Sequence, residues 1–161
     1  MPRGKRIPKR VIAPDPKYNS EMVAKFINFV MERGKKSVAQ ALVYDAIKTL
    51  GEVKKGDGLK FFEQAVEVIK PQVEVRSKRV GGANYQVPVP VPTSRQNALA
   101  FRWIITAARA KKGKPMKDKL ATEFVDILDG VGGSIKKKED VQRMAEANKA
   151  FAHFARFSNK K

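Results

Sequence analysis

The sequence predicts a mainly α-helical single domain of about six helices, with a two-stranded β-hairpin inserted between the third and fourth helices. Six segments carry apolar residues at helical spacing, and only short polar connections separate them. Residues 72–91 instead place apolar side chains at every second position, which is typical of strands. The chain has 161 residues, 42% of them hydrophobic, with no internal repeat and no long interior linker. One hydrophobic core of ordinary size is therefore expected.

Three helices are expected before the hairpin. Short polar residues that can cap a helix precede them: Asn19 or Ser20, Ser37, and Asp57. Helix-breaking residues end them: Gly34, Gly51 and Pro71. Their apolar residues recur at intervals of three and four: Met22, Phe26, Phe29 and Val30; Ala39, Leu42, Val43, Ala46, Ile47 and Leu50; and Leu59, Phe62, Val66 and Ile69. Each helix should therefore bury one face.

Three further helices are expected after the hairpin. Thr93 or Ser94 is expected to cap the fourth, which ends in a basic loop at residues 110–115. The fifth should end at Gly130, and the sixth should begin at about Lys137 and continue towards the tail. Their expected inward-facing residues are as follows: Ala98, Phe101, Ile105 and Ala108; Met116, Leu120, Phe124, Ile127 and Leu128; and Val141, Met144, Ala145 and Asn148.

The expected hairpin, at residues 72–91, has a blocked outer edge. The break between its strands is the stretch from Gly81 to Asn84, whose two glycines can supply positive φ angles. Pro88 and Pro90 remove N–H donors from one edge of the second strand only. This strand can therefore pair with the first strand but not with a third. Because an isolated hairpin is marginally stable, the ribbon must lean on helices or on a ligand.

Basic segments flank the expected helical domain, which spans residues 18–150. Residues 1–17 hold six basic residues, one acid and four prolines. We expect an arm without fixed structure, which either orders on a polyanion or only solubilises the chain. Residues 151–161 form a basic C-terminal tail with three aromatic residues at a spacing of three: Phe151, Phe154 and Phe157. These rings either extend the core stripe of the sixth helix or stack on bases.

The charge balance indicates a polyanionic partner. The chain has 34 Lys and Arg against 16 Asp and Glu, for a net charge of +18. No acid lies between Glu74 and Asp118, where ten basic residues fall: Arg76, Lys78, Arg79, Arg95, Arg102, Arg109, Lys111, Lys112, Lys114 and Lys117. A solvated surface normally mixes both signs, so this acid-free stretch favours phosphate contacts over a merely solvated face.

Catalytic and metal-binding constellations are missing from the sequence. The chain has no cysteine, its single histidine is His153 near the C-terminus, and its acids are scattered singly. We therefore expect no enzymatic activity, no cofactor, no metal and no small-molecule substrate. No apolar run approaches the ~20 residues of a membrane span, so an intracellular protein without membrane contact is expected.

The ribbon is expected to take part in binding. Arg76, Lys78 and Arg79 could contact phosphates. Tyr85 could either stack on an unpaired base or pack against a residue of the opposite strand.

Three functions compete at this point. Basic residues on both termini, the Gly34–Lys36 turn, the ribbon and the Lys111–Lys114 loop suit a folded RNA better than a straight duplex. A DNA-bending protein with the ribbon as its arm is the alternative, and an apolar wedge at the ribbon tip would favour it. An enzyme of nucleic-acid metabolism is the third, and the missing acid–base groups argue against it.

Five stretches in order along nearly the whole chain carry a family resemblance: Asp15–Tyr18 (DPKY), Met31–Ser37 (MERGKKS), Val80–Val89 (VGGANYQVPV), Ala98–Trp103 (ALAFRW) and Met144–His153 (MAEANKAFAH). Together they resemble the bacterial small-subunit ribosomal protein S seven family. After the ribbon this family usually has an acid and two adjacent arginines, whereas this chain keeps only Arg95.

The resemblance implies a helical domain with a protruding β-ribbon and a structural role in the small ribosomal subunit, in the cytoplasm. Members of the family bind the 3′ major domain of small-subunit ribosomal RNA and nucleate assembly of the subunit's head. They lie near the exit tRNA site and the messenger path, and they touch ribosomal protein S eleven and other head proteins. Some also repress their own messenger.

The resemblance and the acid-free stretch together yield the expected contact residues. The resemblance implies these RNA contacts: Arg3, Lys5, Arg6, Lys9, Arg10, Lys35, Lys36, Arg76, Lys78, Arg79, Arg95 and Arg102. The basic stretch adds Arg109, Lys111, Lys112 and Lys114. The ribbon tip expected near the exit-site tRNA comprises Gly81, Gly82, Ala83, Asn84 and Tyr85.

Overall fold

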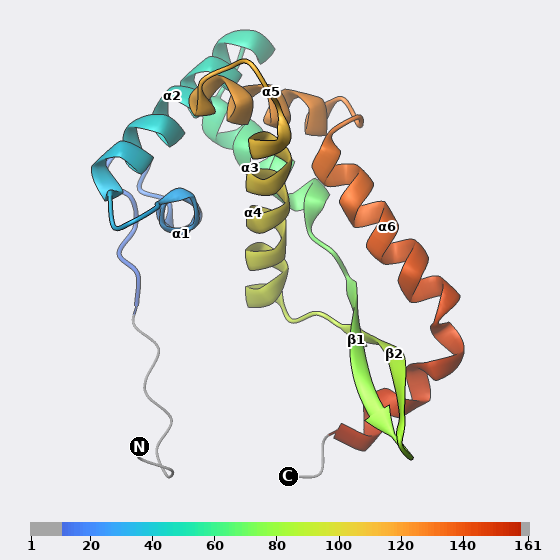
Figure 1. Cartoon of the computed structure of the whole chain (residues 1–161). Helices are drawn as coiled ribbons and strands as arrows, with labels where there is room; N and C mark the ends of the chain where they lie inside the picture. The colour runs from blue at the N-terminus through green and yellow to red at the C-terminus, as the bar shows by residue number, and fades with distance from the viewer. Residues whose placement is uncertain (1–10, 159–161) are drawn as a thin grey trace.

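The computed structural model describes residues 11–158, with side chains through residue 155. Its elements follow in this order: α1 (Glu21–Val30), α2 (Lys36–Lys54), α3 (Gly58–Ile69), β1 (Val73–Val80), β2 (Ala83–Pro90), α4 (Thr93–Ala110), α5 (Met116–Leu128), α6 (Gly133–Ala147) and the 3₁₀ helix η1 (Lys149–Ser158) (Figure 1). The predicted fold class is confirmed, because the described chain is mainly helical and its two-stranded hairpin lies between α3 and α4.

Four phenylalanines from four helices form the centre of the core. Phe26 of α1, Phe62 of α3, Phe101 of α4 and Phe124 of α5 are each at most 1% exposed. The ring centroids of Phe26 lie 5.3 Å from those of Phe62 and Phe101, and the Phe62 and Phe124 centroids are 5.4 Å apart. These three pairs meet edge to face, the arrangement that ring quadrupoles favour. The predicted apolar stripes of α1, α3, α4 and α5 therefore converge on one cluster.

The end of α2 was wrongly predicted. Gly51 does not stop the helix, which continues to Lys54. A Cβ atom on Gly51 would lie 2.9 Å from the carbonyl oxygen of Gly56, and one on Gly58 would lie 2.3 Å from the carbonyl oxygen of Ile47. These glycines allow the backbones of α2 and α3 to approach each other closely, which is why a glycine occurs inside the helix.

Several helix starts also differ from the prediction. Ser20 and Asp57 do cap α1 and α3, with the Asp57 carboxylate accepting from the Leu59 amide at 3.0 Å. The other expected caps lie inside their helices: Ser37 is in α2, which begins at Lys36, and Thr93 and Ser94 are the first residues of α4. α6 begins at Gly133 rather than at about Lys137. Their N-cap residues, Lys35, Pro92 and Gly132, contribute no side-chain hydrogen bond. The backbone is extended at Pro92 and Gly132, and Ser134 near the start of α6 donates to the buried Glu123 of α5.

Two other details of the helical prediction were wrong. α1 ends at Val30, and Gly34 lies in the turn that follows, where its φ angle is +74°. On α6 the expected inward-facing Met144 is 46% exposed, whereas its neighbour Ala145 is buried.

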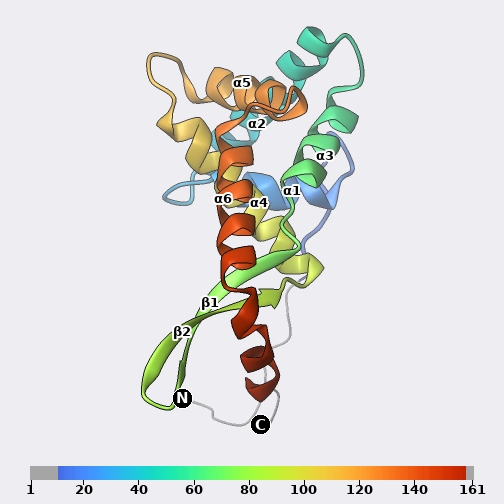
Figure 2. The ribbon, with the colours of Figure 1, turned by 90° about the vertical axis from the view of Figure 1, so that its right-hand side faces the viewer.

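The hairpin extends beyond the core formed by α1–α5 and lies alongside α6, with η1 beside it (Figure 2). Gly81 and Gly82, both at positive φ, form a two-residue turn as type I′ geometry requires. Ala83 and Asn84 already belong to β2, where they pair with Val80 and Arg79, so the predicted four-residue break is shorter. Within the described residues the sheet has only these two strands, in agreement with the proline-blocked edge.

Candidate nucleic-acid interface

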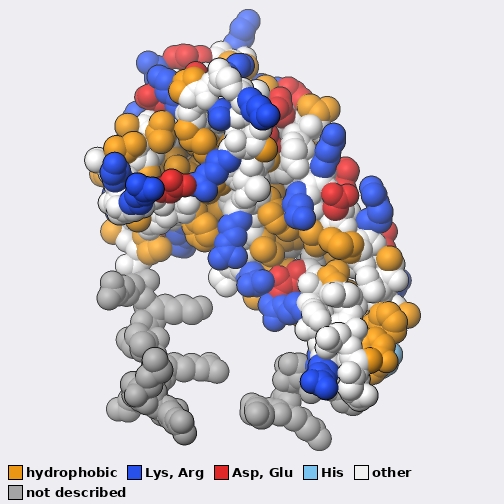
Figure 3. Space-filling model, in the orientation of Figure 1, with side chains coloured by type: hydrophobic (Ala, Val, Ile, Leu, Met, Phe, Trp, Pro, Cys, Tyr) orange, Lys and Arg blue, Asp and Glu red, His pale blue; other side chains and the backbone are white. Residues whose placement is uncertain are grey.

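Two exposed turns on the helical body present lysines without ion pairs among the described residues. Lys35 follows Gly34 in the turn between α1 and α2, and Lys36 is the first residue of α2. A hydrogen bond from the Lys35 amide to the Glu32 carbonyl at 3.0 Å closes this turn. Lys112 and Lys114 flank Gly113 in the loop between α4 and α5. Figure 3 shows Lys and Arg side chains distributed over the helical body as far as the ribbon rather than gathered in one patch. Contacts to a partner would therefore come from separate elements.

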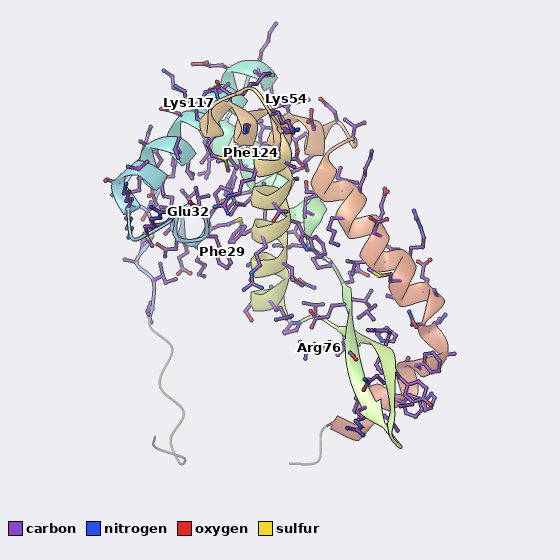
Figure 4. The ribbon with its side chains drawn as sticks, in the orientation of Figure 1. Phe29, Glu32, Lys54, Arg76, Lys117 and Phe124 are labelled. Atoms are coloured by element: carbon purple, nitrogen blue, oxygen red, sulfur yellow. The ribbon has the colours of Figure 1, made fainter. Side chains whose placement is uncertain are left out.

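Two basic residues reach solvent from other positions. Arg79 lies near the ribbon tip, exposed, and has no ion pair within residues 11–155. Arg102 is exposed on α4, with its guanidinium carbon 5.9 Å from the centroid of the Phe29 ring (Figure 4 labels Phe29). The ring quadrupole attracts a cation at this distance. Both charges remain available to phosphates.

At the base of the ribbon a buried carboxylate holds two of the predicted contact residues. Glu74 of β1 is 7% exposed. Its Oε1 accepts from Nε of Arg76 at 2.5 Å, and its Oε2 accepts from Nε of Arg95 at 2.7 Å. Arg76 lies two residues along the same strand, and Arg95 lies in the first turn of α4 (Figure 4 labels Arg76). In the folded protein, an acid that borders the acid-free stretch therefore lies beside two of its basic residues.

Lys111 is likewise held by acids, in this case from α5. Its Nζ lies 2.5 Å from Oδ2 of Asp126 and 2.9 Å from Oε2 of Glu123, which is completely buried. Burial disfavours the charged amine, but the hydrogen bonds to Asp126 and Glu123 outweigh it and raise the pKa of Lys111. Arg109, on the preceding turn, pairs with Glu32 at 2.5 Å. These two cations are thus partly neutralised by the protein itself.

The C-terminal segment packs on the ribbon. The Tyr85 ring centroid lies 5.2 Å from the centroids of both Phe151 and Phe154. Nζ of Lys78, opposite Tyr85 in the hairpin, donates to the carbonyl oxygen of Phe154 at 2.6 Å. This contact with η1 was not among the alternatives considered for Tyr85, and stacking of its ring on an unpaired base stays a prediction. Phe151 and Phe154 therefore pack on the ribbon and do not extend the main core, and their stacking on bases stays a prediction. The Phe157 side chain lies outside the described residues.

The arm residues Arg3, Lys5, Arg6, Lys9 and Arg10 lie outside the described residues. The arm's expected last residues are anchored to α2, because Asp15 is only 3% exposed. Its carboxylate accepts from the amides of Lys17 and Tyr18 at 3.0 and 3.1 Å, and from the Tyr44 hydroxyl at 2.6 Å. Burial and the hydrogen bond to Asp15 raise the pKa of Tyr44 to about 12. Sequence reasoning missed this anchor, for which the lone acid in the basic arm was the only signal.

A hollow of about 750 Å³ lies between the base of the ribbon and α6. Basic residues line it, among them Lys70, Lys138 and Lys149, but so do Glu67 and Glu146. Because both signs of charge occur there, it is not a basic groove. Within residues 11–158 no group of three or more His, Asp or Glu is placed to hold a metal ion. None of the helices in that span is both long and apolar enough to cross a membrane.

Comparison with known proteins identifies the family. The family model described as "Ribosomal protein S7p/S5e" matches residues 2–149. The chain is 56% identical over 154 residues to "Small ribosomal subunit protein uS7" of Thioalkalivibrio sulfidiphilus, covering 96% of this chain and 99% of that protein. The protein of the same name from Chloroflexus aurantiacus is 54% identical over 156 residues, covering 97% and 99%. The chain therefore belongs to the family of ribosomal protein S7p/S5e, as the five sequence stretches predicted.

Proposed function

We propose that this protein binds the 3′ major domain of small-subunit ribosomal RNA directly and nucleates assembly of the subunit's head. As a family member it is a ribosomal protein of the small subunit, it serves translation in the bacterial cytoplasm, and it is not an enzyme. The observation that carries the finer proposal is the placement of exposed cations on separate elements of one packed fold.

Several exposed cations without acidic partners among the described residues are the proposed phosphate contacts: Lys35, Lys36, Arg79, Arg102, Lys112 and Lys114. They come from the α1–α2 turn and the first residue of α2, the ribbon, α4 and the α4–α5 loop. A folded RNA presents phosphates at irregular positions in three dimensions, so spread contacts can recognise its shape. Arg109 and Lys111 are proposed as weaker contacts, since acids already neutralise part of their charge. Arg76 and Arg95, which share Glu74, are proposed as a further pair of contacts.

The proposal extends to the ribbon tip, which would lie near the exit-site tRNA and the messenger path. A Cβ atom on Gly81 or Gly82 would meet nothing within 4 Å, so positive φ and not packing requires these glycines. Ala83 and Asn84 beside them are exposed and small. Such a tip offers backbone groups to a neighbouring RNA and has no apolar wedge for bending DNA. Ribosomal protein S eleven and other head proteins are the proposed protein neighbours.

The test is to titrate the full chain against three fragments of the same ribosomal RNA: the 3′ major, 5′ and central domains. The proposal expects tight binding of the 3′ major fragment and at least about hundredfold weaker binding of the other two at ~0.2 M salt. The 5′ and central fragments are matched controls, because they carry the same charge per nucleotide. Equal affinity for all three fragments would refute the proposed domain specificity.

A further inference from the structure

Glu74 occupies an unusual place for an acid in a basic RNA-binding protein. It is 7% exposed, lies on β1 opposite Val89, and divides its two carboxylate oxygens between two arginines from different elements. Three charged groups therefore meet at the junction of the ribbon and α4, with a net charge of about +1. A hydrophobic residue would fill the same position at lower desolvation cost, so burial alone does not account for the acid.

The two arginines are held by their inner N–H groups and keep others for solvent. Glu74 takes Nε and one terminal nitrogen of Arg76, and Nε of Arg95. The side chains of Arg76 and Arg95 are still 53% and 43% exposed. A guanidinium has five N–H donors in a fixed plane, so the remaining donors can address a phosphate as a fork while the inner ones hold the plane in place.

The start of α4 adds to the positive potential at this point. Arg95 lies in its first turn, where the helix dipole is positive, and no side chain caps this helix start. A cation in that turn is unfavourable in the free protein, and Glu74 offsets it. An RNA phosphate at the junction would meet both guanidinium groups already oriented.

We infer that Glu74 is a positioning residue that makes the Arg76–Arg95 pair selective: it holds both guanidinium planes ready for a phosphate of the correctly shaped RNA and weakens their attraction for any other polyanion. The inference rests on the proposed function and deepens it, because it names what sets specificity at one contact. Without the carboxylate, two mobile arginines would bind phosphates of any RNA. Each binding event would then cost the free energy needed to order their side chains.

The test compares Glu74→Gln with wild type by filter binding of two RNAs, the 3′ major-domain fragment and an unrelated folded RNA of equal length. Glu63→Gln is the matched control, since Glu63 is exposed on α3, has no ion pair within the described residues, and adds the same charge when neutralised. For Glu74→Gln we expect about fivefold tighter binding of the unrelated RNA, with a salt slope steeper by about 0.7 to 0.9. For the ribosomal fragment we expect about tenfold weaker binding, since two rotamer-rich side chains must now be ordered.

A second variant keeps the test informative if Glu74→Gln lowers stability. Arg95→Lys in the wild-type chain retains the charge but loses the fork, and it should weaken binding of the ribosomal fragment more than binding of the unrelated RNA. Equal tightening for both RNAs, or no change in either, would overturn the inference, because Glu74 would then only subtract charge or only stabilise the fold. A wild-type chain that does not prefer the ribosomal fragment would instead refute the proposed function.

Discussion

Replacing Lys111 by Met should destabilise the protein far more than it weakens RNA binding. The substitution keeps an unbranched apolar stem and removes the ammonium that lies 2.9 Å from Oε2 of Glu123. The other oxygen, Oε1, accepts from the amide and hydroxyl of Ser134 at 3.0 and 2.7 Å, so Glu123 would stay buried with half of its charge uncompensated. Breaking a buried ion pair in this way costs about 3–5 kcal/mol. Because the Lys111 side chain is 26% exposed, water can replace part of the ammonium, and we expect about 3 kcal/mol.

Urea denaturation followed by circular dichroism measures this loss of free energy of unfolding. Lys112→Met is the control, because Lys112 is exposed next to Lys111 and has no ion pair within the described residues. It should change stability by less than about 0.5 kcal/mol, yet reduce affinity for the ribosomal RNA fragment. A loss below about 1 kcal/mol in Lys111→Met would refute the reasoning, since Ser134 alone would then satisfy Glu123.

Two more predictions concern the anchors at the ends of the folded chain. Tyr44→Phe should cost about 1–2 kcal/mol at pH 7 by removing the hydroxyl that donates to the buried Asp15. The pKa of Tyr44 is raised from 10.0 to about 12, so the phenol ionises at lower pH in the unfolded chain than in the folded protein. The free energy of unfolding of the wild type should therefore fall between these pH values, and its difference from that of Tyr44→Phe should narrow. A constant difference in urea titrations across that range would contradict this. Tyr85→Ala should speed amide hydrogen exchange in η1 and the ribbon while leaving α1 and α3 protected. Unchanged exchange in η1 would mean that the contacts of Tyr85 with Phe151 and Phe154 do not hold this segment on the ribbon.

The helical framework was predictable because local periodicity and core packing agree. Phe26, Phe62, Phe101 and Phe124 were each placed inward from spacing alone, and all four meet in the core. The hairpin was predictable for the same reason, since alternation, paired glycines and prolines on one edge all favour one register.

What escaped prediction depends on residues far apart in the chain. Glu74 and Arg95 are 21 positions apart, and nothing in local sequence pairs them. The start of α6 was placed four residues late, because Ser134 is fixed by the buried Glu123 on α5 rather than by a cap. Gly51 was mistaken for a helix end because its purpose, the close approach of two backbones, appears only in three dimensions. Charge counted along the sequence therefore overstated how many cations are free.

The most direct test of RNA recognition by shape is competition at ~0.2 M salt between the 3′ major-domain RNA fragment, an equal mass of duplex DNA and an unrelated folded RNA. The full chain should prefer the ribosomal fragment by about 10³-fold or more, because contacts spread over one packed fold match only one arrangement of phosphates. Equal affinity for all three nucleic acids would contradict this account. It would mean that the net charge of +18 alone drives binding.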